Sequence, residues 1–117
     1  MKIVFLAGPY RADTEYGVEA NIQEARRFSV QIWASGAMCF CPHMNTAHFG
    51  GALPDEVWLD GDKEMLRRCD AVFAMPRHYR SVGAKGEIDL ATELGIPIVY
   101  DMDQLRAWIK KVQGEII

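Results

Sequence analysis

Two acidic residues of this 117-residue sequence, Glu87 and Asp62, lie in surroundings that differ from those of ordinary surface acids. Glu87 follows the segment RHYRSVGAKG (77–86), in which basic, hydroxyl and glycine residues lead into a helical pattern. We place Glu87 in the first turn of that helix, where the helix dipole would keep a carboxylate ionised. Gly83 and Gly86 would leave room beside it for a bound molecule, because they carry no side chain.

Asp62 lies on the apolar face of another expected helix. Trp58, Met65 and Cys69 share this face, and Asp62 falls four residues after Trp58 and three before Met65. A carboxylate on a core-facing stripe is costly unless it is paired or lines a cavity. Desolvation there would raise its pKa, as a general acid requires. The alternative is a buried cap, or a partner for an arginine such as Arg11.

An ionised carboxylate and a protonated carboxyl group can together cleave a glycosidic bond. One attacks the anomeric carbon as the nucleophile, and the other transfers a proton to the leaving group. The alternative for Glu87 is an ordinary charge at a helix start. The sequence has no Walker loop and no Gly-x-Gly-x-x-Gly after its first strand. Its Cys39-x-Cys41-x-His43 spacing lacks the usual zinc knuckle, so we expect neither a metal nor a cofactor.

The composition is that of an ordinary soluble protein. Half of the residues are hydrophobic, a quarter are charged, and the net charge is −3 without any basic block. This balance argues against a protein whose partner is a nucleic-acid backbone. No stretch approaches the ~20 apolar residues that a membrane span requires, so we expect no membrane association. We therefore expect a cytoplasmic protein with one domain over residues 1–117.

Short, continuously apolar segments alternate with helical patterns along the chain. The expected strands are 2–7, 37–41, 70–75 and 96–100, and the expected helices are 18–35, 55–69, 83–94 and 102–113. This pattern predicts an α/β fold with a small doubly wound parallel sheet, a Rossmann- or flavodoxin-like three-layer sandwich. The polar segments 8–17, 43–54 and 77–87 all follow strands, so they should converge on one edge of the sheet.

Four segments in order give a resemblance to a known family. They are FLAGPYR (5–11), PHMNTAHF (42–49), LDGDKEMLRRCDAVFAMP (59–76) and SVGAKGEIDLATELGIPI (81–98). Over about residues 1–100 the chain resembles the nucleoside 2-deoxyribosyltransferase-like superfamily. It is most similar to short, largely uncharacterised members related to the 2-deoxynucleoside 5-monophosphate N-hydrolases.

The resemblance implies that Glu87 is a nucleophile that forms a glycosyl ester at C1′ of a ribose or deoxyribose. Asp62 matches the family's acid that assists the departing base. The nucleoside transferases carry an aspartate six residues before the nucleophile, for the 5′-hydroxyl, whereas the 5′-monophosphate hydrolases carry serine. This chain has Ser81 there, and Arg11 matches an arginine in the first loop of the monophosphate enzymes. The alternative for Ser81 is an N-cap.

A phosphate cradle of Arg11, Ser81 and the N–H groups of residues 83–84 is therefore expected. The substrate-binding residues that we expect are Gly8, Pro9, Tyr10, Arg11, His43, Asn45, Ser81, Gly83 and Ala84. His43, Asn45 and His48 either touch the base or phosphate or fill a turn. One departure from the family is Phe5, which stands where a tyrosine often holds the nucleophile, so Glu87 would rely on Tyr10 or on no partner.

Two functions from different classes remain open. The first is cleavage of the N-glycosidic bond of a nucleoside or its 5′-monophosphate, with the sugar passed to water or to another base. The second is a nucleotide-binding sensor without chemistry, which would gain nothing from a carboxylate such as Glu87. A receiver-like domain would need acids after the first strand, and residues 8–11 supply none. The aromatic segment HFGGALPDEVW (48–58) has apolar surface to hide, which predicts a homo-oligomer.

Overall fold

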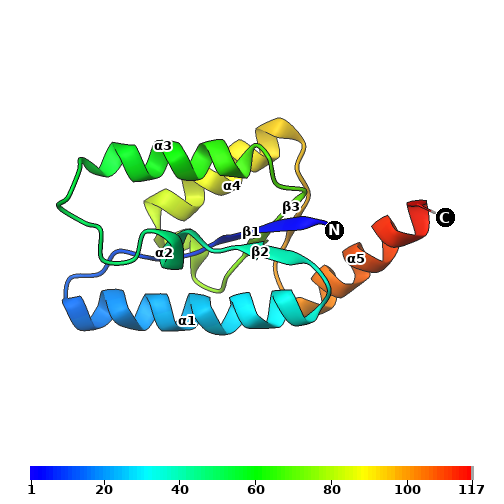
Figure 1. The fold of residues 1–117 in the computed structure, drawn as a ribbon, viewed down its shortest axis with the longest axis horizontal. Helices are drawn as coiled ribbons and strands as arrows, with labels where there is room; N and C mark the ends of the chain where they lie inside the picture. Colours follow the sequence, from blue (N-terminus) through cyan, green and yellow to red (C-terminus); the bar gives the residue numbers. More distant parts are fainter. Residues whose placement is uncertain (117) are drawn as a thin grey trace.

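The computed structural model describes residues 1–116, and a four-stranded parallel sheet lies at its centre (Figure 1). The strands are β1 (Ile3–Ala7), β2 (Met38–Phe40), β3 (Ala71–Ala74) and β4 (Ile98–Val99). They lie side by side in the order β2-β1-β3-β4, and all neighbouring pairs are parallel. The predicted α/β fold is confirmed, with strands slightly shorter than expected.

Helices cover both faces of this sheet, as Figure 1 shows. On one face lie α1 (Glu15–Ala34) and α5 (Met102–Ile116); on the other lie α3 (Asp55–Leu66) and α4 (Val82–Leu94). Successive strand residues point to opposite faces. Val4 and Leu6 therefore enter the core that Leu105 of α5 shares, whereas Phe5 enters the core that contains Ala91 of α4. None of the described helices is long and apolar enough to cross a membrane.

Local capping explains where the helices begin and end. The Thr14 hydroxyl accepts a hydrogen bond from the Gly17 N–H (3.0 Å), so α1 starts three residues earlier than predicted. Gly95 adopts a left-handed conformation (φ 73°) and ends α4 at Leu94, as predicted. Two short helices occupy segments that we expected to be loops: α2 (Pro42–Asn45) and the 3₁₀ helix η1 (His78–Arg80).

The central strands β1 and β3 form the topological switch point of the sheet. Ala7 pairs with Ala74, so the two strands end at the same level. The chain after β1 then turns to α1 on one face, whereas the chain after β3 turns to α4 on the other face (Figure 1). The two loops diverge, and ligands of doubly wound folds bind in the crevice that such loops leave.

Gly8 is the first residue after β1, and its close approach to β3 gives a test of this packing. A Cβ at position 8 would lie 2.7 Å from Sδ and 2.9 Å from Cβ of the buried Met75. We expect Gly8→Ala to lower the free energy of unfolding by about 1–3 kcal/mol in urea titrations, because Met75 must shift. Gly61→Ala on α3 is the control, since it meets open space and should stabilise the helix by about 0.5–1 kcal/mol. Wild-type stability of Gly8→Ala would contradict the close contact.

Candidate active site

Glu87 lies in the second turn of α4, not in the first turn as predicted. The helix begins at Val82, and the Ser81 hydroxyl caps it by accepting a hydrogen bond from the Ala84 N–H at 3.1 Å. Glu87 is then the sixth helical residue, beyond the first turn in which the dipole acts strongly. Its side chain is directed into the protein, and the residue is only 8% exposed.

The protonation state of Glu87 also differs from the prediction. Burial raises the pKa of its carboxyl group from 4.5 to about 8, and the nearby Asp62 carboxylate adds to this rise. Lys63 opposes the rise but does not outweigh these two effects. The expectation that the helix dipole keeps Glu87 ionised is therefore wrong, because desolvation dominates at this position.

Asp62 lies on α3, which packs against α4, as Figure 1 shows. Its carboxyl group is partly buried, and this burial raises its pKa from 3.8 to about 6. The raised pKa agrees with the predicted position on the inward-facing stripe. The alternative that Arg11 neutralises Asp62 is wrong, because Arg11 instead forms an ion pair with Asp55 at the start of α3, with 2.5 Å between Nη2 and Oδ2.

Glu87 and Asp62 form a coupled pair of carboxyl groups. Their pKa values of about 8 and about 6 lie on either side of neutral pH. Because the two groups interact, these values describe the pair. Between pH 6 and pH 8 the pair holds one proton and one negative charge. One proton and one charge are what a nucleophile and a proton donor need together on a glycosidic bond, but in the ligand-free protein the higher pKa of Glu87 places the proton on Glu87.

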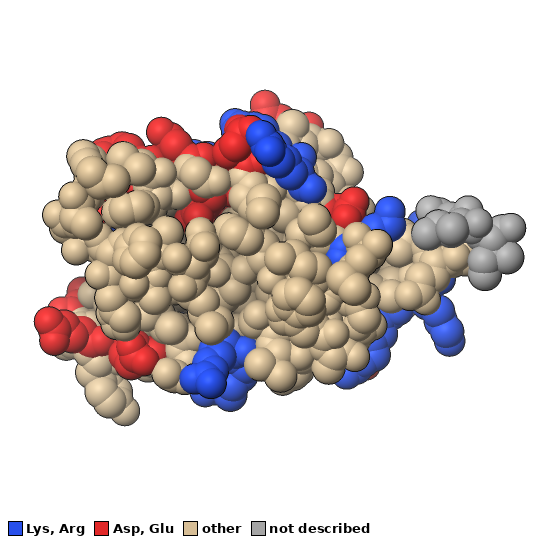
Figure 2. Space-filling view, in the orientation of Figure 1, with Lys and Arg blue, Asp and Glu red and all other residues tan. Residues whose placement is uncertain are grey.

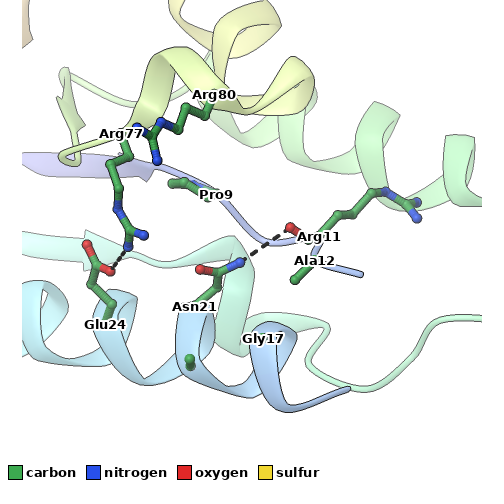
Figure 3. A pocket seen from close by; sticks show the side chains of 9 residues that line it. Pro9, Arg11, Ala12, Gly17, Asn21, Glu24, Arg77 and Arg80 are labelled. Atoms are coloured by element: carbon green, nitrogen blue, oxygen red, sulfur yellow. Dashed lines mark hydrogen bonds and ion pairs between the residues drawn. The ribbon is translucent and has the colours of Figure 1, made fainter. Parts of the chain in front are cut away.

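A cavity of about 370 Å³ lies at the switch point, between the β1 loop and the chain after β3 (Figure 3). Its lining residues are Pro9, Arg11, Ala12, Gly17, Ala20, Asn21, Glu24, Arg77 and Arg80. Arg77 forms an ion pair with Glu24 of α1. Arg80 forms no ion pair with any carboxylate in the described part of the chain. The lining includes neither Glu87 nor Asp62, so the cavity and the carboxylate pair are separate features.

The predicted phosphate cradle is not assembled in this structure. The Ala84 N–H donates to the Ser81 hydroxyl, so it is not free to hold an anion. Figure 3 shows the Arg11 side chain extending away from Arg77 and Arg80, and it reaches Asp55. Ser81 is the N-cap that we considered as the alternative, and Gly83 beside it is exposed. Arg80, one residue before Ser81, lines the cavity together with Arg11 and Arg77.

The residues after β2 that were predicted to contact a ligand lie in different surroundings. His43 is 4% exposed, and its Nε2 lies 3.1 Å from the Gly8 carbonyl oxygen and 2.8 Å from that of Pro9. Asn45 is exposed. The Tyr10 hydroxyl accepts a hydrogen bond from the His48 N–H at 3.4 Å, so it is engaged away from Glu87. His43 therefore supports the β1 loop instead of facing the cavity.

Two polar residues of α1 that line the cavity, Asn21 and Glu24, were missed in the sequence. Asn21 and Glu24 are three residues apart on α1 and are only partly exposed. Polar side chains beside the buried positions Ile22 and Ala25 were the signal that could have identified them. The described residues contain no group of three His, Cys, Asp or Glu side chains that could hold a metal ion.

Solved structures of two 2-deoxyribosyltransferases have the same fold as this chain. The 2-deoxyribosyltransferase of the psychrotolerant bacterium Bacillus psychrosaccharolyticus matches with a TM-score of 0.63 and 18% identity, over 82% of this chain and 69% of that one. The Leishmania mexicana enzyme matches with a TM-score of 0.62 and 21% identity, over 86% of this chain and 63% of its own. The solution structure of BlsM matches with a TM-score of 0.59 and 22% identity, over 97% and 73%.

These likenesses establish a shared fold and nothing more, because the three sequence identities are only 18–22%. This chain spans between 63% and 73% of the length of these relatives. No curated protein sequence matches it. A family model does match, over residues 2–101, and this range contains all four strands, the carboxylate pair and the cavity. The chain therefore belongs to the family described as domain of unknown function DUF7768.

Proposed function

We propose that this protein cleaves the N-glycosidic bond of a nucleoside 5′-monophosphate or nucleoside, with Glu87 as nucleophile and Asp62 as proton carrier. The observation that carries the proposal is the coupled carboxylate pair on α3 and α4, which holds one proton near neutral pH. The fold that the chain shares with two 2-deoxyribosyltransferases supports it.

Before the first step the proton of the pair passes from Glu87, which has the higher pKa in the ligand-free protein, to Asp62, so that Glu87 is ionised. A Glu87 carboxylate oxygen bonds to C1′ of the sugar while the C1′–N bond breaks. Asp62 gives its proton to the departing base, so that the base leaves neutral and not as an anion. The positive charge that develops on the sugar stabilises the ionised form of Glu87, which burial disfavours in the ligand-free protein.

In the second step the glycosyl ester is broken. Water, or a nitrogen of another base, attacks C1′ and gives its proton to Asp62. The bond between C1′ and the Glu87 oxygen breaks, and its electron pair returns to the carboxylate. The pair is then restored with one proton and one negative charge. The choice of acceptor depends on what occupies the site beside Asp62.

A 5′-phosphate would bind near the start of α4. Arg80, which forms no ion pair within the described residues, lies there, and the Ser81 hydroxyl, which accepts from Ala84, can still donate its own proton. The N-terminus of the helix adds a favourable field for an anion. Arg11 would have to leave Asp55 to join them, and that exposed ion pair is weak enough to exchange.

A non-catalytic nucleotide sensor is the second candidate. The observation that favours it is the separation of the arginine-lined cavity from the carboxylate pair. A sensor needs the cavity alone, and Glu87 would then be a buried acid without a reaction.

Glu87→Gln separates the two candidates. We expect it to abolish release of free base from 2′-deoxynucleoside 5′-monophosphates while their binding is retained, as chromatography and calorimetry would show. With the wild type, a 2-fluoro-2-deoxyarabinosyl nucleotide should leave a covalent adduct visible by intact-mass spectrometry, and the variant should leave none. Tight binding without turnover or adduct in the wild type would support the sensor instead.

Glu87→Gln should abolish turnover but raise the thermal stability of the protein at alkaline pH. The native state favours protonated Glu87, so the protein loses stability as pH rises from 4.5, the unfolded pKa, to about 8. Glu87→Gln should therefore melt at a higher temperature than the wild type at pH 8, with the difference vanishing near pH 4.5. A lower melting temperature at pH 8 would mean that Glu87 is a favourable helix-end charge.

The proton balance of the pair predicts the pH dependence of turnover. Activity requires one proton on the pair, so kcat/KM should be bell-shaped, with limbs near pH 6 and pH 8. Asp62→Asn should lower turnover at least about 100-fold, because the proton carrier is lost. Asp60→Asn on the same helix is the control, since that side chain is exposed. A flat profile between pH 5 and pH 9 would exclude this mechanism.

We also propose that the protein is a homo-oligomer. Four large apolar side chains are at least 40% exposed on the loop before α3 and its first turns: Phe49, Leu53, Val57 and Leu59. Figure 2 shows a surface of mostly uncharged residues over this loop. Exposed apolar side chains gathered on one segment are typical of an interface.

Leu53→Lys tests this interface, because it places a charge among these side chains. Size-exclusion chromatography with light scattering should show an oligomer for the wild type at micromolar concentration and a monomer for Leu53→Lys. Val30→Lys, on the exposed side of α1, should remain an oligomer. A monomeric wild type would refute the proposal.

A further inference from the structure

Four successive backbone carbonyl groups after β1 are held by only two side chains. His43 Nε2 lies 3.1 Å from the Gly8 oxygen and 2.8 Å from the Pro9 oxygen. Asn21 Nδ2 donates to the Tyr10 oxygen at 3.0 Å and to the Arg11 oxygen at 3.4 Å. Figure 3 shows Asn21 of α1 directed at this loop. Side chains of two separate elements therefore fix the loop from both ends.

The groups around His43 determine its tautomer and its charge. Both neighbours of Nε2 are carbonyl oxygens, which only accept hydrogen bonds, so Nε2 must carry the proton. Nδ1 is buried and has no hydrogen-bond partner among the described residues. A proton there would bury an unsatisfied donor and a charge, and burial accordingly lowers the pKa of His43. The ring therefore stays neutral, with its donor directed at the loop.

Asn21 belongs to a polar stripe that holds both walls of the cavity. Asn21 binds the β1 loop, and Glu24, one turn later on α1, binds Arg77 in the chain after β3. The two loops that diverge at the switch point are thus fastened to the same helix face. Pro9 and Arg11, whose carbonyl groups are held, themselves line the cavity.

We propose that His43 and Asn21 are positioning residues that clamp residues 8–11 and so fix the cavity wall against which the nucleotide binds. The clamp follows from the hydrogen bonds alone, whereas its effect on nucleotide binding rests on the proposed function. Glu87 and Asp62 are carried by other elements, α4 and α3. Loss of the clamp should therefore weaken substrate binding and leave the chemical step largely intact.

Two pairs of variants isolate the donor groups. His43→Leu removes the donor, whereas His43→Gln keeps an N–H group that can reach the same carbonyl oxygens. Asn21→Asp replaces a donor by an acceptor of almost the same shape, which repels the carbonyl groups. Gln31→Ala is the control on α1, since that side chain is exposed and makes no hydrogen bond in the described part of the chain.

NMR relaxation of the 13.2 kDa protein gives the first readout. In the wild type, the imidazole nitrogen correlations should show the proton on Nε2, and the amides of Tyr10 and Arg11 should have order parameters near about 0.85. His43→Leu and Asn21→Asp should lower these values toward about 0.6. His43→Gln and Gln31→Ala should keep them. A proton on Nδ1, or an unchanged loop in both disruptive variants, would overturn the clamp.

Steady-state kinetics with the four 2′-deoxynucleoside 5′-monophosphates gives the second readout. Each disruptive variant should raise KM about tenfold, since about 1.4 kcal/mol of binding free energy corresponds to a factor of ten. The value of kcat should change by less than about threefold, and His43→Gln should restore KM. A fall in kcat at unchanged KM would overturn the positioning role. Absence of wild-type turnover would refute the proposed function alone, and the NMR readout would still decide on the clamp.

Discussion

Desolvation of the Glu87 carboxyl group is the constraint on which the site depends. α4 turns this side chain into the protein, on the face of the sheet that Phe5 and Val72 fill, and water is largely excluded from it. The cost appears as a pKa of about 8, to which the Asp62 carboxylate across the α3–α4 contact contributes. An acid placed there only for stability would be a poor choice, because a neutral side chain of similar size would cost less. The position is therefore explained better by what a coupled pair can do with one proton.

The fold supplies the cavity by one topological device. The order β2-β1-β3-β4 makes β1 and β3 neighbours that end at the same level, so the loops that follow these two strands start side by side. These two loops lead to opposite faces of the sheet. Both are bound by α1, through Asn21 for the loop after β1 and through Glu24 for the loop after β3. His43, from the segment after β2, completes the support. Regular structure thus sets where the loops begin, and a few side-chain hydrogen bonds set where they go.

The sequence predicts the regular elements well, because continuous apolar strands alternating with helical patterns have few other solutions. It also predicts that Glu87 and Asp62 share one site. It does not predict the balance of forces on Glu87, which depends on whether the helix starts at Val82 or later and on how deeply α4 is buried. Nor does it decide the roles of His43 and Ser81, for which ligand binding and a structural role were both open. Both residue types suit ligand binding, and only the structure shows the carbonyl and N–H groups that already occupy them.

The separation of cavity and carboxylates has a consequence for how such a fold gains or loses activity. The arginine-lined cavity draws on α1 and the loops after β1 and β3, whereas the acid pair draws on α3 and α4. Replacing Glu87 by a neutral residue would remove the proposed nucleophile, relieve the cost of burial and leave the cavity intact. The architecture is therefore more stable without the buried acid than with it. The presence of both acids is thus an argument for a reaction, since the fold is stabler without their charge.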